Sequence, residues 1–335
     1  MKKDNGVKTM DNRQTLIIMT GIPGSGKSTI AKYLRDGEIE GFEYLNSNNT
    51  KILSSDECRK QLLGDEKDQS DNKRVFDFLK MKMVEFIKAG YNVIIDATNI
   101  NMKERKGYLD LVKRYDLQKV AYVVNEPFNE CEERAAKREE RPLSKEILFK
   151  IMSRFQCPQS FEGLEVIFHH KQISEDDVRK SHALSFSYIS EIQSAMFDNM
   201  RACMDVFQDN PHHKYTINEH CRRMALMFNT TDDCQWLAAR LHDIGKVFTR
   251  TYDENGVAHY YGHDNVGAYY ICSHIPEIFF NENKRDILFT IFLINYHMLP
   301  FSIKEEKTEK KYKELFGEEW YNKLLLLHKA DKENC

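Results

Sequence analysis

The sequence lacks long hydrophobic runs, paired cysteines and a strong excess of either charge. No stretch approaches the ~18 consecutive apolar residues of a membrane-spanning helix, and the polar residues 1–13 contain no apolar core of a secretory signal. The eight cysteines are scattered without a CxxC pair, which argues against a disulfide framework and against structural zinc. We therefore expect a protein of the reducing cytoplasm that has no membrane partner.

The composition is otherwise that of an ordinary soluble protein, with 41% apolar and 30% charged residues. A net charge of −3 gives no overall attraction to polyanions, so any nucleic-acid site must be a local patch. The 335 residues exceed the usual length of one domain, and two domains of roughly 150 residues are expected.

The two halves of the chain differ in hydrophobic pattern. In the first half, short apolar runs alternate with amphipathic stretches such as residues 71–88, which is typical of a parallel sheet with crossover helices. From residue 173 to 326 the pattern is helical, including residues 187–207 and 235–241. We predict an α/β domain at residues 1–172 followed by an all-α domain at residues 173–335, joined in the polar stretch 169–180. The predicted strands are residues 15–20, 51–55, 92–96, 120–124 and 165–168.

A glycine-rich loop with the pattern GxxxxGK[ST] follows the first predicted strand. Its glycines let backbone N–H groups point at phosphate oxygens. Lys27 supplies a charge to the β and γ phosphates, and the Ser28 hydroxyl can ligate Mg²⁺. A helix predicted at residues 29–34 completes the context that the motif requires. The loop predicts binding of ATP, or another nucleoside triphosphate, with Mg²⁺ by Gly21, Gly24, Ser25, Gly26, Lys27, Ser28 and Thr29.

A carboxylate follows the second predicted strand. Asp56 lies at the carboxyl end of that strand, where it can face the transferred phosphoryl group and accept a hydroxyl proton. The alternative is that Asp56 only caps a helix at residues 57–63.

Two arginines and a basic stretch also point to phosphate. Arg134 and Arg138 are four residues apart on a predicted helix, from which they can close over a γ-phosphate, although neighbouring glutamates also suit a solvated face. Residues 80–114 hold eight basic side chains against four acidic ones, which fits either a solvated surface or a phosphate-binding patch.

Together these motifs resemble those of the phage-type 5′-OH polynucleotide kinases. The resemblance covers residues 15–154 and includes Ser55-Asp56-Glu57-Cys58-Arg59, Asp96-Ala97-Thr98-Asn99 and Arg134-Ala135-Ala136-Lys137-Arg138. It implies that Lys27 and Ser28 hold the donor phosphates and Mg²⁺, and that Asp56 is the general base. It also implies acceptor contacts by Arg59, Thr98 and Asn99, and transition-state stabilisation by Arg138 with Arg134.

The second half contains histidines and aspartates in a pattern that suits a metal site. His242 and Asp243 follow an apolar helix, with Gly245 expected as its C-cap, and a capping box at residues 216–219 places His220 in the first turn of another helix. Imidazole and carboxylate ligands without thiolates suit Mn²⁺, Fe, Co²⁺, Ni²⁺ or Mg²⁺. Further candidate ligands are His263, His297 and Asp331.

This half resembles the HD-superfamily phosphohydrolases, in particular the HD domain attached to bacterial tRNA nucleotidyltransferases. The resemblance covers residues 205–331 and rests on residues 211–220 and on Leu241-His242-Asp243-Ile244-Gly245-Lys246. It implies a first metal site at His220, His242, Asp243 and Asp331, a second ion at His263 and His297, catalysis at Asp243, and phosphate binding by Lys246.

A 5′-kinase joined to a phosphoesterase resembles the kinase–phosphatase proteins of RNA end repair, although the DxDxT-type phosphatase motif of the best-known ones is absent. The combination implies phosphorylation of 5′-OH ends and removal of 2′,3′-cyclic phosphate or 2′(3′)-phosphate from broken RNA, with tRNA as one candidate. No adenylated-lysine motif of a ligase is present, so a separate RNA ligase is implied. Two alternatives stay open: a small-molecule kinase fused to an HD nucleotidase, and a nucleotide-gated P-loop domain that regulates an HD hydrolase.

Overall fold

The computed structural model describes most of the chain. The predicted boundary at 172/173, most of the stretch 169–180, residues 187–202 of one expected helix, and Pro211 to His213 lie outside the described residues. The described residues are 13–138, 142–169, 203–210, 214–228, 233–274 and 283–334.

The first half is built on a parallel sheet with the strand order β2-β3-β1-β4-β5. Each predicted strand is present, with ends that differ by at most two residues because apolar runs mark the buried centre of a strand more sharply than its ends. The strands are β1 (Thr15–Thr20), β2 (Thr50–Ser54), β3 (Asn92–Asp96), β4 (Gln118–Val123) and β5 (Glu165–Phe168).

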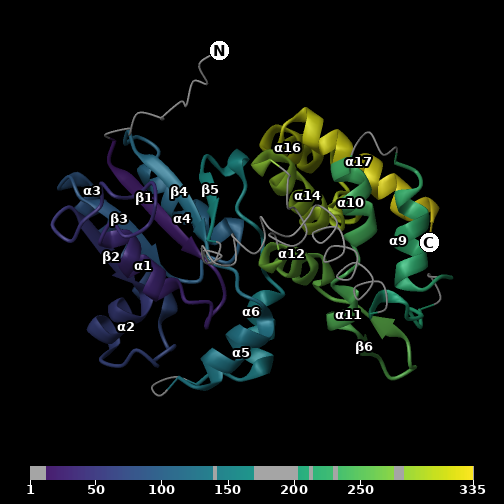
Figure 1. Cartoon of the computed structure of the whole chain (residues 1–335), viewed down its shortest axis with the longest axis horizontal. Coiled ribbons are helices and arrows are strands. Elements are labelled where there is room, and N and C mark those ends of the chain that lie inside the picture. Colours follow the sequence, from purple (N-terminus) through teal and green to yellow (C-terminus); the bar gives the residue numbers. More distant parts are fainter. Residues whose placement is uncertain are drawn as a thin grey trace, which may run out of the picture.

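Helices cover both faces of this sheet (Figure 1). Apolar side chains of α3 and α4 pack on one face with Leu16 and Ile18, whereas α1 packs on the other face with Ile17 and Met19. The α/β expectation is therefore confirmed. The helices are α1 (Lys27–Arg35), α2 (Ser55–Leu63), α3 (Asn72–Lys88), α4 (Met102–Val112), α5 (Phe128–Ala136), α6 (Lys145–Met152) and the short 3-10 helix η1 (Ser160–Glu162).

The second half is mainly helical, as expected, but it also contains a small hairpin. Strands β6 (Thr251–Tyr252) and β7 (Ala258–His259) pair antiparallel across a turn in which Asp253 N–H bonds Val257 O. The helices are α9 (Ile217–Ala225), α10 (Asp233–Leu241), α11 (Lys246–Thr249), α12 (His263–Ser273), α14 (Lys284–Tyr296), α15 (Leu299–Ser302), α16 (Glu306–Phe316) and α17 (Glu318–Glu333). Among the described residues, none of these helices is long and apolar enough to span a membrane.

The two halves share a hydrophobic core. Cys131 of α5 and Phe155 after α6 belong to the same buried cluster as Tyr269 of α12 and Phe292 of α14. The rings of Phe155 and Tyr269 meet edge to face, with centroids 5.3 Å apart. Figure 1 shows α5, α6 and α12 side by side where the halves meet. The α/β half therefore packs directly on the helical half.

Candidate active sites

The glycine-rich loop connects β1 to α1 and passes close to α5. A Cβ atom on Gly24 would lie 2.2 Å from the carbonyl oxygen of Cys131, and its φ of +87° is one that side chains rarely adopt. Only glycine therefore fits at this position. The loop ends at Gly26, which precedes the first residue of α1, Lys27.

Lys27 follows this loop as the first residue of α1, and its ammonium group is shielded from solvent. Its side chain is buried and Nζ donates to Ile22 O at 2.8 Å. Burial lowers the pKa of Lys27 to about 8, and the nearby carboxylate of Asp96 opposes that shift. A buried ammonium group beside backbone N–H donors suits a polyphosphate. Ser28 lines the adjoining cavity, Ser25 is buried in the loop, and Thr29 N–H bonds Gly26 O.

One cavity of about 470 Å³ joins the donor loop to the predicted acceptor residues. It lies at the carboxyl ends of the parallel strands, where ligands bind in open α/β sheets. The residues that line it include Lys27, Ser28, Asp56, Arg59, Asp96, Thr98, Asn99 and Arg138.

Asp56 does not cap α2. The cap is Ser54, whose hydroxyl accepts hydrogen bonds from the N–H groups of Asp56 and Glu57. The carboxylate of Asp56 instead accepts a bond of 2.6 Å from Arg59, whose side chain is 5% exposed whereas that of Asp56 is 46% exposed. Arg59 also donates to Asn72 at 3.2 Å. This geometry orients one carboxylate toward the cavity, as a general base requires.

The two predicted arginines lie in different surroundings. Arg138 lines the cavity, but α5 ends at Ala136, so the expected single helical face for Arg134 and Arg138 is wrong. The charged residues after Ala136 fit a longer helix in the sequence, but α5 ends there, with Lys137 as its C-cap. Arg134 lies outside the cavity lining and pairs with Glu126 and Glu130.

Thr98 and Asn99 hold the loop after β3 against β1. Gly21 N–H bonds Thr98 O at 3.1 Å, and the Asn99 amide donates to Met19 O at 2.7 Å. Asn99 has a φ of +45°, and its carbonyl accepts a bond from the buried Arg105. Asn99 thus shapes the cavity through its side-chain bond to the backbone of β1 and through the bond that its own carbonyl accepts from Arg105.

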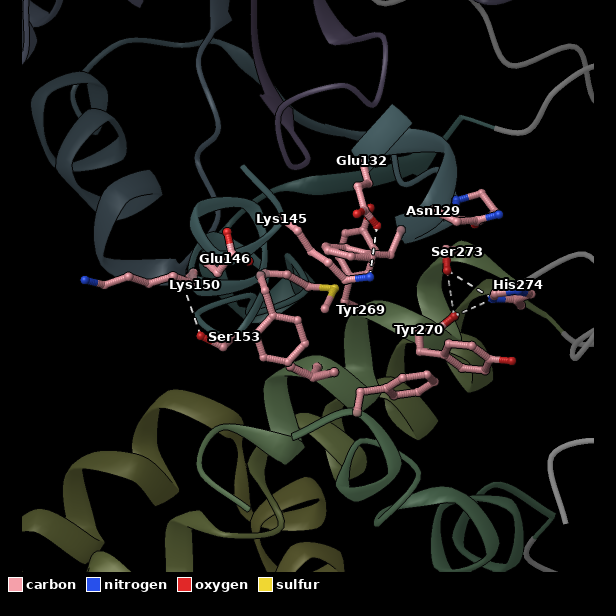
Figure 2. A pocket seen from close by; sticks show the side chains of 16 residues that line it. Asn129, Glu132, Lys145, Glu146, Lys150, Ser153, Tyr269, Tyr270, Ser273 and His274 are labelled. Carbon is pink, nitrogen blue, oxygen red and sulfur yellow. Dashed lines mark hydrogen bonds and ion pairs between the residues drawn. The ribbon is translucent and has the colours of Figure 1, made fainter. Parts of the chain in front are cut away.

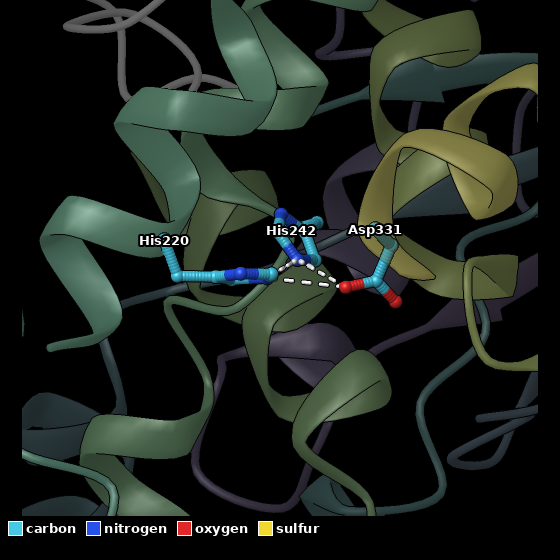
Figure 3. Close-up of side chains that lie close together, drawn as sticks. All are labelled: His220, His242 and Asp331. Carbon is cyan, nitrogen blue, oxygen red and sulfur yellow. Dashed lines mark hydrogen bonds and ion pairs between the residues drawn. The ribbon is translucent and has the colours of Figure 1, made fainter. Parts of the chain in front are cut away.

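In the second half, His220, His242 and Asp331 converge from α9, the end of α10 and α17 (Figure 3). His220 Nε2 lies 3.1 Å from Asp331 Oδ1 and 3.3 Å from His242 Nε2. All three residues are buried, and α17 packs against α10 and α14 through Leu324 and Leu327, which anchors Asp331 near the end of the chain.

Asp243 faces two groups of histidines at once. Its Oδ2 lies 3.4 Å from His242 Nε2 and 3.6 Å from His220 Nε2. Its Oδ1 lies 3.2 Å from His263 Nε2 and 3.8 Å from His297 Nε2. One carboxylate can therefore contact two adjacent cations. Cys221, which sequence reasoning missed although it follows His220, lies 3.8 Å from the Nδ1 of His242.

The hydrogen bonds of the outer ring nitrogens test whether these residues fit a metal. The Nδ1 atoms of the four histidines donate to the backbone carbonyls of Asn334, Ala239, Tyr260 and Ile294. In neutral rings this leaves each Nε2 with a lone pair directed at the centre. Lone pairs and carboxylates that face one another without protons repel, and a divalent cation removes that repulsion. The donor set therefore fits divalent metal ions.

The electrostatics of the cluster favour ionised carboxylates. Without a metal, burial lowers the pKa of His242, but Asp243 outweighs burial and raises that pKa well above its usual value. Burial raises the pKa of Asp243, but the protonated His242 and Lys246 outweigh it and hold that pKa well below its usual value. Burial also acts on His297, where it and the neighbouring histidines lower the pKa to about 3. Lys246 Nζ lies 2.8 Å from Asp243 Oδ2 and donates to Gln208 at 2.9 Å. In this geometry Lys246 is paired with Asp243.

Gly245 was expected to be the C-cap of the helix before His242, and this expectation is wrong because α10 already ends at Leu241. Its φ is −63°, and it precedes α11. A Cβ atom there would lie 1.9 Å from the carbonyl oxygen of His263, so the glycine lets the chain after Asp243 pass against the start of α12.

Comparison with known proteins matches the two halves separately. A family model described as an AAA domain matches residues 16–158, and one described as an HD domain matches residues 212–333. The chain joins an AAA domain to an HD domain. The AAA domain is a kinase-like P-loop domain and the HD domain is of the phosphohydrolase type, so the protein is an enzyme.

Two curated relatives match part of this chain at modest identity. The "Putative bifunctional polynucleotide kinase/RNA ligase" of Autographa californica nuclear polyhedrosis virus is 24% identical over 163 residues, which are 47% of this chain and 23% of the relative. The "Adenylate kinase isoenzyme 6 homolog" of Plasmodium falciparum is 33% identical over 107 residues, which are 29% of this chain and 55% of the relative. The chain thus covers less than two thirds of either relative's length.

Among solved structures, one chain of the Pnkp1/Rnl/Hen1 RNA repair complex is similar to this protein over 46% of each chain. The sequence identity is 24% and the TM-score is 0.35.

A second cavity, of about 810 Å³, opens between the two domains and was not anticipated (Figure 2). It is lined by α5 and α6 of the AAA domain and by α12 of the HD domain, and it contains neither the P-loop nor the histidine cluster. Its signal in the sequence is weak, because the aromatic residues that line it are also typical of a buried core. They are Phe128, Phe149, Phe248, Tyr269 and Tyr270.

Proposed function

We propose that the protein heals the broken ends of RNA: it phosphorylates 5′-OH ends with ATP, and it opens and removes 2′,3′-cyclic phosphate or 2′(3′)-phosphate. The observation that supports this most directly is the shared cavity of the AAA domain, in which the donor residues Lys27 and Ser28 and the acceptor-side Asp56 and Arg59 line one space. Such a cavity brings a phosphoryl donor and a hydroxyl acceptor together.

In the kinase reaction the 5′-oxygen forms a bond to the γ-phosphorus, and the bond from that phosphorus to the bridging oxygen of ADP breaks. Asp56 accepts the hydroxyl proton, and Arg59 holds the carboxylate in place through their 2.6 Å contact. Lys27 and Arg138 offset the negative charge of the transferred group, and Ser28 is the protein ligand of Mg²⁺.

A polynucleotide acceptor accounts for further side chains that line the cavity. They include Lys80, Arg154 and the ring of Phe76. Cationic groups next to an aromatic ring suit a phosphodiester and a base. The viral relative is named as a polynucleotide kinase and RNA ligase, which favours the same class of acceptor.

In the HD domain, one divalent ion would be held by His220, His242, Asp243 and Asp331, and a second would be held by Asp243, His263 and His297. Bound Mn²⁺, Ni²⁺, Co²⁺, Fe or Mg²⁺ supplies a Lewis acid and lowers the pKa of coordinated water. The Nδ1 bonds to backbone carbonyls keep the histidines oriented, and Lys246 neutralises charge beside Asp243, where it can bind substrate phosphate.

Pairing these activities favours RNA as the substrate, because cleavage through the 2′-hydroxyl leaves a 5′-OH and a 2′,3′-cyclic phosphate, and DNA has no 2′-hydroxyl. Joining the healed ends needs a separate RNA ligase as partner. Broken tRNA is one candidate substrate. We place the boundary between the two activities at residues 172/173.

An acceptor competition tests the kinase half. Radiolabelled ATP is offered with a 5′-OH RNA oligonucleotide and with adenosine 5′-monophosphate and small alcohols in excess. We expect label on the oligonucleotide, and we expect none with Asp56→Asn. Transfer to the nucleotide alone would instead support a small-molecule kinase, the alternative that the adenylate kinase relative favours.

A further inference from the structure

The segment 153–157, between α6 and η1, is bound by both domains. On the HD side it makes hydrogen bonds to two asparagine side chains. Asn265 donates to Ser153 O at 3.0 Å, and Asn295 donates to Phe155 O at 3.0 Å while its oxygen accepts from Cys157 N–H at 2.8 Å. Figure 2 labels Ser153 of this segment and Tyr269 of α12 among the residues that line the cavity between the domains.

The two asparagines form a connected polar network. Asn295 also donates to the Asn265 side chain at 2.8 Å, and it is 2% exposed. Burying an amide is costly unless it is hydrogen-bonded, and here both donors of Asn295 and its oxygen have partners. A purely apolar contact would join the domains without the free-energy cost of burying amide groups. The network therefore specifies the position of the segment that it binds.

On its other side the segment is hydrogen-bonded to residues 100–102, which follow the predicted acceptor residues Thr98 and Asn99. Gln156 N–H bonds Ile100 O at 2.9 Å, and the Gln156 side chain accepts from Met102 N–H at 3.1 Å. Arg154 donates to Glu104 at 2.9 Å, its side chain is 59% exposed, and it lines the acceptor cavity. The asparagines of the HD domain thus hold the backbone from which Arg154 enters the kinase site.

We propose that the HD domain completes the acceptor site of the AAA domain. Asn265 and Asn295 are positioning residues that fix the segment 153–157 and so direct the Arg154 guanidinium at a phosphodiester of the acceptor, downstream of its 5′-hydroxyl. This rests on the proposed function, because it requires a polynucleotide acceptor. A guanidinium binds a phosphodiester through paired hydrogen bonds, so its reach and angle matter more than those of an ammonium group.

Steady-state kinetics with the full chain test this proposal, with a 5′-OH RNA oligonucleotide as the acceptor. We expect Arg154→Ala and Asn295→Ala each to raise the acceptor KM about tenfold, equal to about 1.4 kcal/mol, while the KM for ATP stays within about twofold. The double variant should be no worse than Arg154→Ala alone, because Asn295 acts through Arg154. Asn265→Ala and Asn295→Asp give second variants if Asn295→Ala folds poorly.

A matched control is Glu165→Gln, which weakens the exposed interdomain ion pair with Lys284 and leaves the segment untouched. It should leave both KM values unchanged. Independent effects of Arg154 and Asn295 that multiply in the double variant, or an acceptor KM within about twofold in Asn295→Ala, would overturn the inference and leave the proposed kinase in place. A wild-type protein that phosphorylates no oligonucleotide would remove both.

Discussion

At the scale of single residues, the outer nitrogen of each histidine ring distinguishes a metal ligand from a packed side chain. Every Nδ1 in the cluster donates to a backbone carbonyl, so every Nε2 is available at the centre. The sequence predicts these histidines from the adjacent His242 and Asp243. Ala239 and Ile294 lie three positions before His242 and His297, but only the folded backbone shows that each Nδ1 bonds that carbonyl. For Arg134 the sequence spacing misled. Its distance of four residues from Arg138 suggested a shared role, but Arg134 pairs with Glu126 and Glu130 outside the cavity that Arg138 lines.

Metal binding should therefore stabilise the protein. At a Mn²⁺ concentration about 100 times the dissociation constant, the gain in unfolding free energy is about 2.7 kcal/mol, which is measured as a rise in Tm over the chelated protein. Asp243→Ala should abolish most of this rise, because Asp243 faces both histidine groups. An equal rise in wild type and Asp243→Ala would place the metal elsewhere.

We expect Asp56 to contribute to phosphoryl transfer and not to the stability of the fold. Asp56→Asn keeps the size of the side chain but cannot accept the proton, so kcat for phosphoryl transfer should fall at least about 100-fold with the KM for ATP little changed. Ser54→Ala is the matched control, because it removes the N-cap of α2 at a cost of about 1 kcal/mol and leaves the base in place. A larger kcat loss in Ser54→Ala than in Asp56→Asn would contradict this assignment.

At the scale of elements, strand and helix periodicity predicts most of the fold, and turns account for what it missed. Residues 255–256 are an Asn-Gly pair, a common hairpin turn, yet strands as short as β6 and β7 leave no alternation to detect. The end of α5 is similar, since the charged residues after Ala136 continue a helical pattern in the sequence although the helix ends there. The role of Gly245 could not be predicted from the sequence, because it depends on the close approach of α12, which only the folded chain brings near.

Gly245 provides a test of this close approach. Gly245→Ala would force its Cβ against His263 O, so we expect a loss of about 1–3 kcal/mol in unfolding free energy together with weaker metal binding. Gly107→Ala, within α4, is the control, because its Cβ would meet only the flexible end of Lys80 and should stabilise the helix. Chemical denaturation of both variants measures the difference, and equal stability would refute the contact.

At the scale of the whole molecule, the sequence predicts two domains but not their shared core. Phe155 and Tyr269 are residue types found in any buried core, so neither signals a contact between domains. They lie 114 positions apart in the sequence, and only the folded chain brings them together. The asparagine network at the interface is equally invisible in the sequence, because asparagine is ordinarily a turn or capping residue.

The shared core should make the two domains unfold together. We expect one calorimetric transition, which Mn²⁺ shifts as a whole although it binds only the HD domain. Two separate transitions, of which Mn²⁺ shifts only one, would show that the interface contributes little to stability.

The central claim is that one chain heals both ends of a broken RNA at two separate sites. The direct measurement is an end-product assay on a short RNA with a 5′-OH and a 2′,3′-cyclic phosphate, supplied with ATP, Mg²⁺ and Mn²⁺ or Ni²⁺. Wild type should convert both ends, Lys27→Ala should convert only the 3′ end, and Asp243→Ala only the 5′ end. An RNA left unchanged by wild type while ATP is consumed on a small acceptor would contradict the claim.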